Sequence, residues 1–230
     1  MELFQSGPGP RTSFQRWWAS KVTGKILNIG CNNDPMGLND DIKLPTGIPV
    51  IQGLHKDVVQ FDLDFWPHKQ FIQGDAHNLP FKDDWFEMVI MGDIHEHLVD
   101  PLKASLESCR VSKKWVVWTI FEEWRLPGHG QFIDEGQHQS NLDTIRAFGG
   151  KYNTPTEMIV ATAKVQVYDD VKLPHLSHIN QFNDEDIAGL VYTCCKTYGL
   201  KLLHFLKVPE QTQDGHEWSN WLIALERKDS

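Results

Sequence analysis

The chain has 230 residues, a hydrophobic fraction of 40% and a formal net charge of −9. This length fits one α/β domain with an insertion, and the apolar content is enough for a packed core, which argues against wholesale disorder. The acidic balance, with no run of more than two basic residues, argues against duplex nucleic acid as a partner, because such binding needs a basic surface.

The cysteines and the start of the chain indicate a reducing compartment. Cys31, Cys109, Cys194 and Cys195 include no Cys-x-x-Cys pair, so we expect free thiols. Residues 1–10 lack the basic start and apolar centre of a signal peptide, and no apolar run is long enough to span a bilayer. We therefore predict a cytoplasmic protein without a membrane segment.

An N-terminal arm and a short helix are predicted over residues 1–21. Residues 1–11 are rich in Gly and Pro, and either Thr12 or Ser13 can cap a helix that runs to Lys21. This helix either packs on a sheet or covers the edge of a ligand site, and its aromatic residues favour packing.

Residues 25–30 predict a first buried strand that ends in a tight turn at Gly30-Cys31-Asn32-Asn33. Glycine and asparagine tolerate the left-handed backbone that a close approach to a ligand needs. An ordinary strand-to-turn glycine explains the same pattern. Residues 36–57 are dense in Gly, Pro and Asp, so a helix there must be short or broken.

Each of the next three predicted strands is followed by a carboxylate. The strands and carboxylates are 58–61 with Asp62, 71–73 with Asp75, and 86–91 with Asp93. In an open parallel sheet, ligands bind in the crevice beyond the strand ends. Asp62, as the first residue past its strand, can accept two hydrogen bonds from vicinal ribose hydroxyls; it is otherwise a turn residue, and Asp64 is a competing position.

The segment His95-Glu96-His97 follows the strand that ends at Asp93. A His-x-His pair can bind a metal ion, but a metal site needs a third and a fourth ligand. None stands at a suitable spacing in the sequence, so we predict no metal site.

Helical and strand patterns alternate in the rest of the chain. Asp100 caps a helix with Pro101 at its first position, and residues 115–121 form a β-branched and aromatic strand. Trp124 follows this strand and is a candidate substrate-facing aromatic residue. Residues 124–181 show no sustained period, which predicts a substrate lid or specificity insertion.

In the last part of the chain, either Asn183 or Asp184 caps a predicted helix that runs to Tyr198, with Gly199 as its C-terminal signal. Strands are predicted over 200–208 and 221–226. The linker between these strands, 209–220, is long for a hairpin. Apolar strands that alternate with other elements predict an α/β fold whose mostly parallel sheet is covered on both faces.

Three motifs carry a resemblance to a known family. They are Gly74-Asp75-Ala76-x-x-Leu79-Pro80-Phe81, Asp83-x-x-Phe86-Glu87-x-Val89 and Glu96-His97-Leu98-x-Asp100-Pro101. Together they resemble the class I S-adenosylmethionine-dependent methyltransferases, with the small-molecule and glycan-modifying branches as the nearest. The resemblance covers residues 25–121 well and 182–228 in outline.

The resemblance implies a Rossmann-like fold in which the chain, 1–230, is one domain and ends in an antiparallel hairpin at the edge of the sheet. It implies S-adenosylmethionine as cofactor and methyl transfer to a small-molecule or glycan acceptor. The cofactor-binding residues that it implies are Asn28, Gly30, Cys31, Asn32, Asp62, Asp75, Ala76 and Asp93. Asp75 would accept from the adenine amino group, and the Ala76 amide would donate to the adenine ring.

Glu96 and His97 are the candidate catalytic residues, because in this family the segment after the fourth strand lines the cofactor and faces the acceptor. Either can act as a base or orient the acceptor. Alternatively, His97 is a satisfied structural residue beneath the ends of the strands.

Three other functions remain open. A nicotinamide-dependent enzyme would carry Gly-x-Gly-x-x-Gly after the first strand, which residues 30–35 do not supply. A non-catalytic S-adenosylmethionine-binding or interaction protein is favoured by Asn28, where the family has an acidic residue, and by the asparagines at 32 and 33. A nucleic-acid methyltransferase would carry an Asn/Asp-Pro-Pro-Tyr/Phe-type segment after the fourth strand, and the sequence has none.

Overall fold

The computed structural model describes residues 10–31, 57–65, 70–123, 182, 184–211 and 217–228. The elements in these ranges are, in chain order, α1 (Pro10–Ala19), β1 (Ile26–Ile29), β2 (Val58–Asp62), β3 (Phe71–Gln73), β4 (Phe86–Gly92), the 3-10 turn η2 (His95–His97), α2 (Pro101–Val111), β5 (Ser112–Glu123), α5 (Asp184–Tyr198), β6 (Leu200–Gln211) and β7 (Glu217–Arg227). The predictions for Asn32, for most of 36–57, and for the insertion at 124–181 with Trp124 lie outside the described residues.

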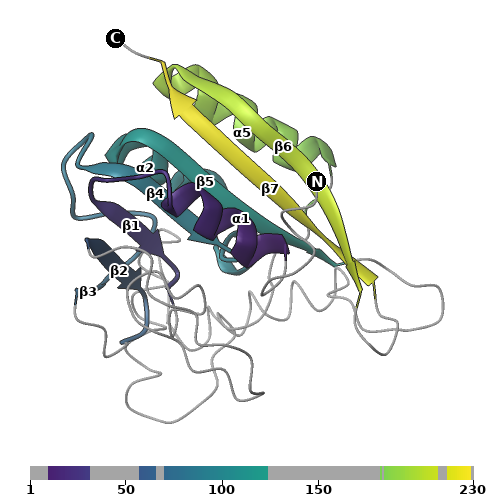
Figure 1. Cartoon of the computed structure of the whole chain (residues 1–230), viewed down its shortest axis with the longest axis horizontal. Helices are drawn as coiled ribbons and strands as arrows, with labels where there is room; N and C mark the ends of the chain where they lie inside the picture. The colour runs from purple at the N-terminus through teal and green to yellow at the C-terminus, as the bar shows by residue number, and fades with distance from the viewer. Residues whose placement is uncertain are drawn as a thin grey trace, which may run out of the picture.

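The strands of the described ranges form one seven-stranded sheet with the order β3-β2-β1-β4-β5-β7-β6. Neighbouring strands from β3 to β5 are parallel, whereas β7 runs antiparallel to both β5 and β6. Figure 1 shows the long β6–β7 hairpin at one edge of this sheet. The predicted fold class, a mostly parallel Rossmann-like sheet that ends in an antiparallel hairpin, is confirmed.

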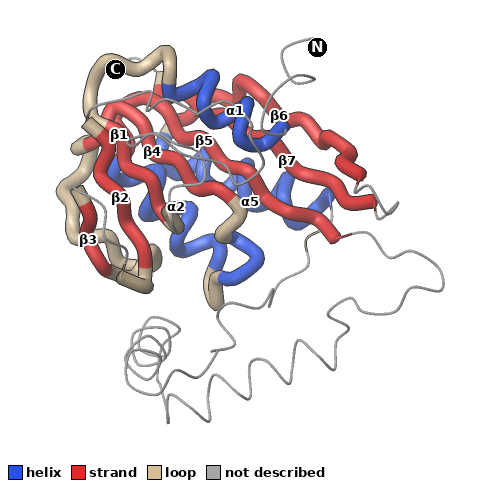
Figure 2. The backbone as a smooth tube through the Cα atoms, turned by 60° about the horizontal axis from the view of Figure 1, so that its bottom comes forward, coloured by secondary structure: helices blue, strands red, loops and turns tan. Residues whose placement is uncertain are grey.

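Helices lie on both faces of the sheet (Figure 2). Alternate strand residues point to opposite faces, so Ile26 and Ile90 pack with α1 while Leu27 and Met91 pack in the cluster that contains α2 and α5. This arrangement explains why the parallel strands read as continuous apolar runs.

The first helix differs from its prediction at both ends. It begins at Pro10 and ends at Ala19, so Thr12 and Ser13 lie inside the helix and cap nothing. Proline is favoured in the first turn because its missing N–H would have had no helical partner there. The predicted packing is confirmed, since the Phe14 and Trp18 side chains are buried against the sheet.

The predicted long linker between the last two strands is wrong. Residues 209–211 belong to β6 and residues 217–220 belong to β7, and Gln211 pairs with Glu217 at the end of the ladder. Strand pairing uses backbone groups, so it continues through polar residues that show no hydrophobic pattern. Pro209 is tolerated because β6 is an edge strand, where a missing N–H breaks no second ladder.

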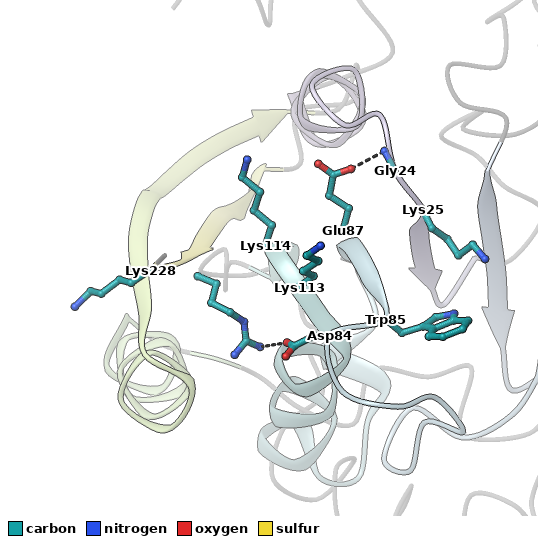
Figure 3. A pocket seen from close by; sticks show the side chains of 9 residues that line it. Gly24, Lys25, Asp84, Trp85, Glu87, Lys113, Lys114 and Lys228 are labelled. Atoms are coloured by element: carbon teal, nitrogen blue, oxygen red, sulfur yellow. Dashed lines mark hydrogen bonds and ion pairs between the residues drawn. The ribbon is translucent and has the colours of Figure 1, made fainter. Parts of the chain in front are cut away.

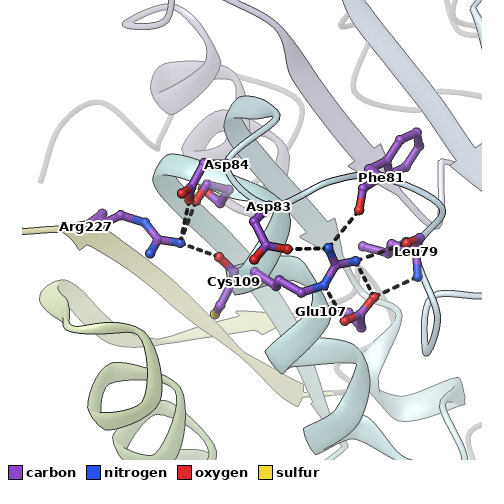
Figure 4. A network of polar contacts seen from close by, with 9 residues as sticks. Leu79, Phe81, Asp83, Asp84, Glu107, Cys109 and Arg227 are labelled. Carbon is purple, nitrogen blue, oxygen red and sulfur yellow. Dashed lines mark hydrogen bonds and ion pairs between the residues drawn. The ribbon is translucent and has the colours of Figure 1, made fainter.

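The helix α2 begins as predicted and anchors the loop before β4. Its N-cap is Asp100, whose Oδ1 accepts from the Lys103 backbone N–H at 2.9 Å. Near its other end, the Arg110 guanidinium donates to the backbone carbonyl groups of Leu79 and Phe81 at 3.0 and 2.7 Å, as Figure 4 shows. The loop that links β3 to β4 is therefore held against the helix that follows β4.

Candidate functional site

The predicted ligand residues gather at the carboxyl edge of the parallel strands. Backbone hydrogen bonds link the strand ends: the N–H of Gly30 donates to Phe61 O at 2.8 Å, and the N–H of Gly74 donates to Asp62 O at 2.9 Å. Because β3, β2, β1 and β4 are consecutive neighbours, Gly30, Asp62, Asp75 and Asp93 end up along one edge.

Gly30 has the left-handed backbone conformation that the sequence predicted, with φ +71°. A Cβ atom there would lie 2.9 Å from Cδ1 of Ile94. Glycine is therefore required both by its φ angle and by the packing of Ile94, which follows β4. Cys31 is fully buried, and its N–H donates to Phe61 O at 3.3 Å.

Asp62 is the last residue of β2, whereas the sequence placed it just past the strand. Its Oδ1 accepts from the Asp64 backbone N–H at 3.1 Å, which closes a local turn of the kind that Asp favours. The ribose contact of Asp62 stays a prediction.

Asp75 is buried and shares one of its oxygens with His77. Oδ1 accepts from the His77 backbone N–H at 2.9 Å and lies 2.6 Å from His77 Nδ1. His77 Nε2 accepts from the Asp100 backbone N–H at 3.2 Å, so the proton of a neutral imidazole sits on Nδ1 and points at Asp75. The second oxygen, Oδ2, is buried and has no hydrogen-bond partner among the described residues. A buried acceptor of this kind calls for a donor, which a ligand can supply.

Ala76 is buried beside Asp75. Asn28 lies inside β1, where its Nδ2 donates to Gln60 Oε1 at 2.7 Å, and both side chains are fully buried. Asn28 and Gln60 are also cross-strand neighbours in the β1–β2 ladder. The predicted roles of Asn28 and Ala76 at the cofactor stay predictions.

Asp93 directly follows β4, and its side chain contacts residues of α1 and β5. It has φ 51°, forms an ion pair with Arg11 of α1, and its Oδ1 accepts from Thr119 Oγ1 at 2.9 Å. Gln15 of α1 donates in turn to Thr119 Oγ1 at 2.8 Å. The first helix therefore packs on the sheet and also reaches the ligand edge, which joins the two roles that the sequence left as alternatives.

Glu96 lies in η2 and is almost completely buried, with only 1% of the residue exposed. Burial, together with the charge of Asp93, raises the pKa of the Glu96 carboxyl well above its usual range, and the Arg11 guanidinium opposes part of this rise. The Glu96 side chain therefore keeps its proton to higher pH than an exposed carboxyl. A neutral carboxyl can donate a hydrogen bond, and it is poorly suited to removing a proton.

The two histidines beside Glu96 differ in their surroundings. His95 is fully buried, lies 3.0 Å from Ser105 Oγ through Nε2, and has its pKa lowered to about 3 by burial, so it is a neutral ring in the core. His97 is half-buried and closes the turn by donating its backbone N–H to Ile94 O at 2.9 Å. The catalytic assignments of Glu96 and His97 stay predictions.

Within the described ranges, no group of three or more His, Cys, Asp or Glu side chains is arranged to hold a metal ion. In the same ranges, no helix has the length and the apolar content needed to cross a lipid bilayer.

Several residues of this edge were not singled out from the sequence. His77 could have been found, because an Asp-x-His pair allows the Asp side chain to bond both to the backbone and to the ring. Arg11, Gln15 and Thr119 carry no local signal. Arg11 and Thr119 contact Asp93, and Gln15 contacts Thr119, only when α1 docks on the sheet.

A match to a sequence family agrees with the resemblance carried by the motifs. Residues 54–115 match a sequence family described as a methyltransferase domain. A comparison with curated protein sequences gave no match.

Solved structures share the fold. One from Bacillus halodurans, named as a candidate methyltransferase, is 12% identical with a TM-score of 0.53, and the alignment covers 94% of this chain and 98% of that one. A candidate methyltransferase of Haloferax volcanii, solved with the Trm112 methyltransferase activator, is 12% identical with a TM-score of 0.50, covering 96% and 91%. A candidate sarcosine dimethylglycine methyltransferase from Galdieria sulphuraria is 11% identical with a TM-score of 0.50, covering 94% and 86%. The predicted fold is therefore confirmed, and the match over residues 54–115 supports the predicted resemblance to methyltransferases.

Proposed function

We propose that this chain is an enzyme that transfers a methyl group from S-adenosylmethionine to a small-molecule or glycan acceptor at the carboxyl edge of β1–β4. The methyltransferase-domain match over residues 54–115 supports the reaction type. The observation that carries the site is the buried, unpaired Oδ2 of Asp75.

An unpaired buried carboxylate oxygen is costly, because it has given up water without gaining another donor. The cost is recovered when a ligand supplies an N–H, and the amino group of adenine is such a donor. His77 fixes the orientation of the Asp75 carboxylate by occupying Oδ1. This arrangement supports Asp75 as the acceptor for adenine, and the position of Asp62 on the neighbouring strand is compatible with the proposed ribose contact.

The sulfonium of S-adenosylmethionine supplies an already activated methyl group, so the protein has to align the acceptor and exclude water. The raised pKa of Glu96 favours acceptor orientation by a neutral carboxyl over removal of a proton. His97 is placed on the same turn and is assigned the same orienting role.

The acceptor class rests on charge. The chain carries a net charge of −9, which disfavours a nucleic-acid acceptor through repulsion of its phosphates. The predicted acceptor contacts in 124–181, the division into one domain with an insertion, and the cytoplasmic location stay predictions.

Substitution of Asp75 tests the cofactor site. In Asp75→Asn the amide keeps a single acceptor oxygen, so either His77 or adenine loses its hydrogen bond. We expect affinity for S-adenosylhomocysteine, measured by calorimetry, to fall at least about tenfold, since a hydrogen bond to a charged group contributes about 1.5–3 kcal/mol. Asp83→Asn is the matched control, because Asp83 is 73% exposed and lies in the loop before β4. Equal affinity of wild type and Asp75→Asn, with normal circular dichroism, would refute the adenine site.

A labelled-methyl screen over metabolite, glycan and nucleic-acid fractions tests the acceptor. Transfer to metabolites or glycans is expected. Transfer to nucleic acid alone would overturn the acceptor class, and tight cofactor binding without transfer to any fraction would favour the non-catalytic alternative.

A further inference from the structure

A second potential binding site lies at the end of the sheet opposite the Asp75 edge. A cavity of about 680 Å³ opens where β4 and β5 begin and β7 ends. Parallel strands place their amino ends together at this edge, so the cavity cannot share residues with the strand ends at Asp62, Asp75 and Asp93. We call it the amino-edge cavity.

The lining of the amino-edge cavity is strongly cationic, although the whole chain is acidic. Its cationic side chains are Lys25, Lys113, Lys114, Arg227 and Lys228, against the carboxylates Asp84 and Glu87. Both carboxylates already have partners within the protein. Glu87 Oε2 accepts from the Gly24 backbone N–H at 2.5 Å, and Asp84 Oδ1 lies 3.1 Å from Arg227 Nη2.

Arg227 also has several partners within the protein. Besides Asp84, its Nη2 donates to the carbonyl oxygens of Cys109 and Ser112 at 2.8 Å each. Within the described ranges, the four lysines form no ion pair with a carboxylate. The Nζ atom of Lys25 lies 5.5 Å from the ring centroid of Trp85, and that of Lys114 lies 4.1 Å from the ring centroid of Trp115. Positive charge therefore remains in excess in this lining, although Glu87 offsets part of it, and a bound anion reduces the repulsion among the lysines.

Figure 3 shows Lys113 and Lys114 between Lys25 and Trp85 on one side and Lys228 on the other, with the Lys25 and Lys228 side chains extending away from the middle pair. A single phosphate cannot reach all four ammonium groups when they are spread in this way. The volume is in the range of small-molecule sites, and a lysine ammonium is a good donor to phosphate oxygens.

We propose that the amino-edge cavity binds a small polyanion that carries two or more phosphate groups. The site is independent of the methyl-transfer site, because no residue belongs to both. A large polyanion is disfavoured by the net charge of −9, which repels every phosphate that extends beyond the cavity.

Calorimetric titration of the full chain with sodium tripolyphosphate tests the proposal. One equivalent is expected to bind, more weakly as the salt concentration rises. Lys113→Gln with Lys114→Gln removes two charge-assisted contacts and is expected to weaken binding at least about tenfold. The matched control, Lys103→Gln with Lys196→Gln, removes the same charge from exposed positions on α2 and α5 and is expected to leave affinity within about twofold.

Three results would overturn the proposal. The first is no binding to wild type, and the second is equal loss of affinity in the cavity and control variants, which would indicate a general charge effect. The third is a single-stranded oligonucleotide that binds much more tightly than tripolyphosphate and depends on the same lysines. Affinity for S-adenosylhomocysteine is measured on each variant, and it should stay at the wild-type value because the methyl-transfer site is untouched.

Discussion

Two neighbouring carboxyl groups, those of Asp93 and Glu96, have different surroundings at the carboxyl edge of the sheet. Asp93 has Arg11 and Thr119 as partners. Glu96 is buried, its Oε2 has no hydrogen-bond partner, and the charge of Asp93 adds to the effect of burial on its pKa. Burial and the neighbouring charge thus move the pKa of Glu96 away from the ordinary value of a glutamate.

Glu96→Gln tests this shift through the pH dependence of stability. Because the pKa of Glu96 is raised above 4.5 in the folded state, the folded chain binds more protons than the unfolded chain between pH 4.5 and the folded pKa. The free energy of unfolding then falls as pH rises through that window, by up to about 1.4 kcal/mol per pH unit. Wild type should therefore lose stability relative to Glu96→Gln as pH rises above 4.5.

The measurement is thermal unfolding of wild type and Glu96→Gln from pH 5 to pH 8. Glu185→Gln is the control, since Glu185 is exposed on α5 and its curve should run parallel to that of wild type. A constant difference between Glu96→Gln and wild type across this range would show that Glu96 is ionised in the folded chain.

At the scale of the elements, Arg110 of α2 holds the loop before β4. Arg110 also bonds both oxygens of Glu107, at 2.7 and 2.8 Å, and Glu107 Oε2 accepts from the Leu79 backbone N–H at 2.9 Å. The hydrogen bonds with Glu107 raise the pKa of the Arg110 guanidinium. Because Leu79 lies four residues after Asp75, this network fixes the segment that leads away from the predicted adenine site.

Arg110→Lys should therefore destabilise the protein. A lysine ammonium cannot reproduce the planar fork that spans Glu107 and two backbone carbonyl groups, so we expect a loss of about 2 kcal/mol in the free energy of unfolding, measured by urea denaturation. Asp83→Asn removes only the exposed arm of the network and should cost less than about 1 kcal/mol. Equal effects of the two substitutions would mean that the backbone contacts contribute little.

For the molecule as a whole, α1 supplies the packing on one face of the sheet within the described ranges. Trp18 is 4% exposed and packs with Met88, Ile90 and Val117 in the same buried cluster. Its ring also lies edge-on to His204 of β6, with centroids 5.7 Å apart. The start of the chain is thereby tied to the C-terminal hairpin.

Trp18→Ala should cost about 3–5 kcal/mol in the free energy of unfolding, because it leaves a large cavity under α1. Trp18→Phe keeps an aromatic ring and removes the Nε1–H, which is buried without a partner, so it should cost much less. Chemical denaturation of both variants provides the comparison. Similar losses in the two would indicate that the size of the side chain is not what stabilises this face.

The sequence by itself determined the order of the elements and the carboxylates that end the strands. Apolar runs such as 86–91, the N-cap at Asp100 and the stop at Gly199 are local signals, because each depends on side chains and backbone angles within a few residues. Gly199 has φ +64°, as its position at the end of α5 required. The hairpin length was missed because strand pairing through 209–211 depends on a distant backbone.

Only the tertiary structure decided what each carboxylate contacts. Arg11 and Asp93 are 82 positions apart, and Gln15 reaches Thr119 across 104 positions, so no local pattern could pair them. The amino-edge cavity likewise combines residues from before β1, from the starts of β4 and β5 and from the end of β7. Burial and charge neighbours set the pKa of Glu96, and both exist only once α1, β4 and β5 have packed together.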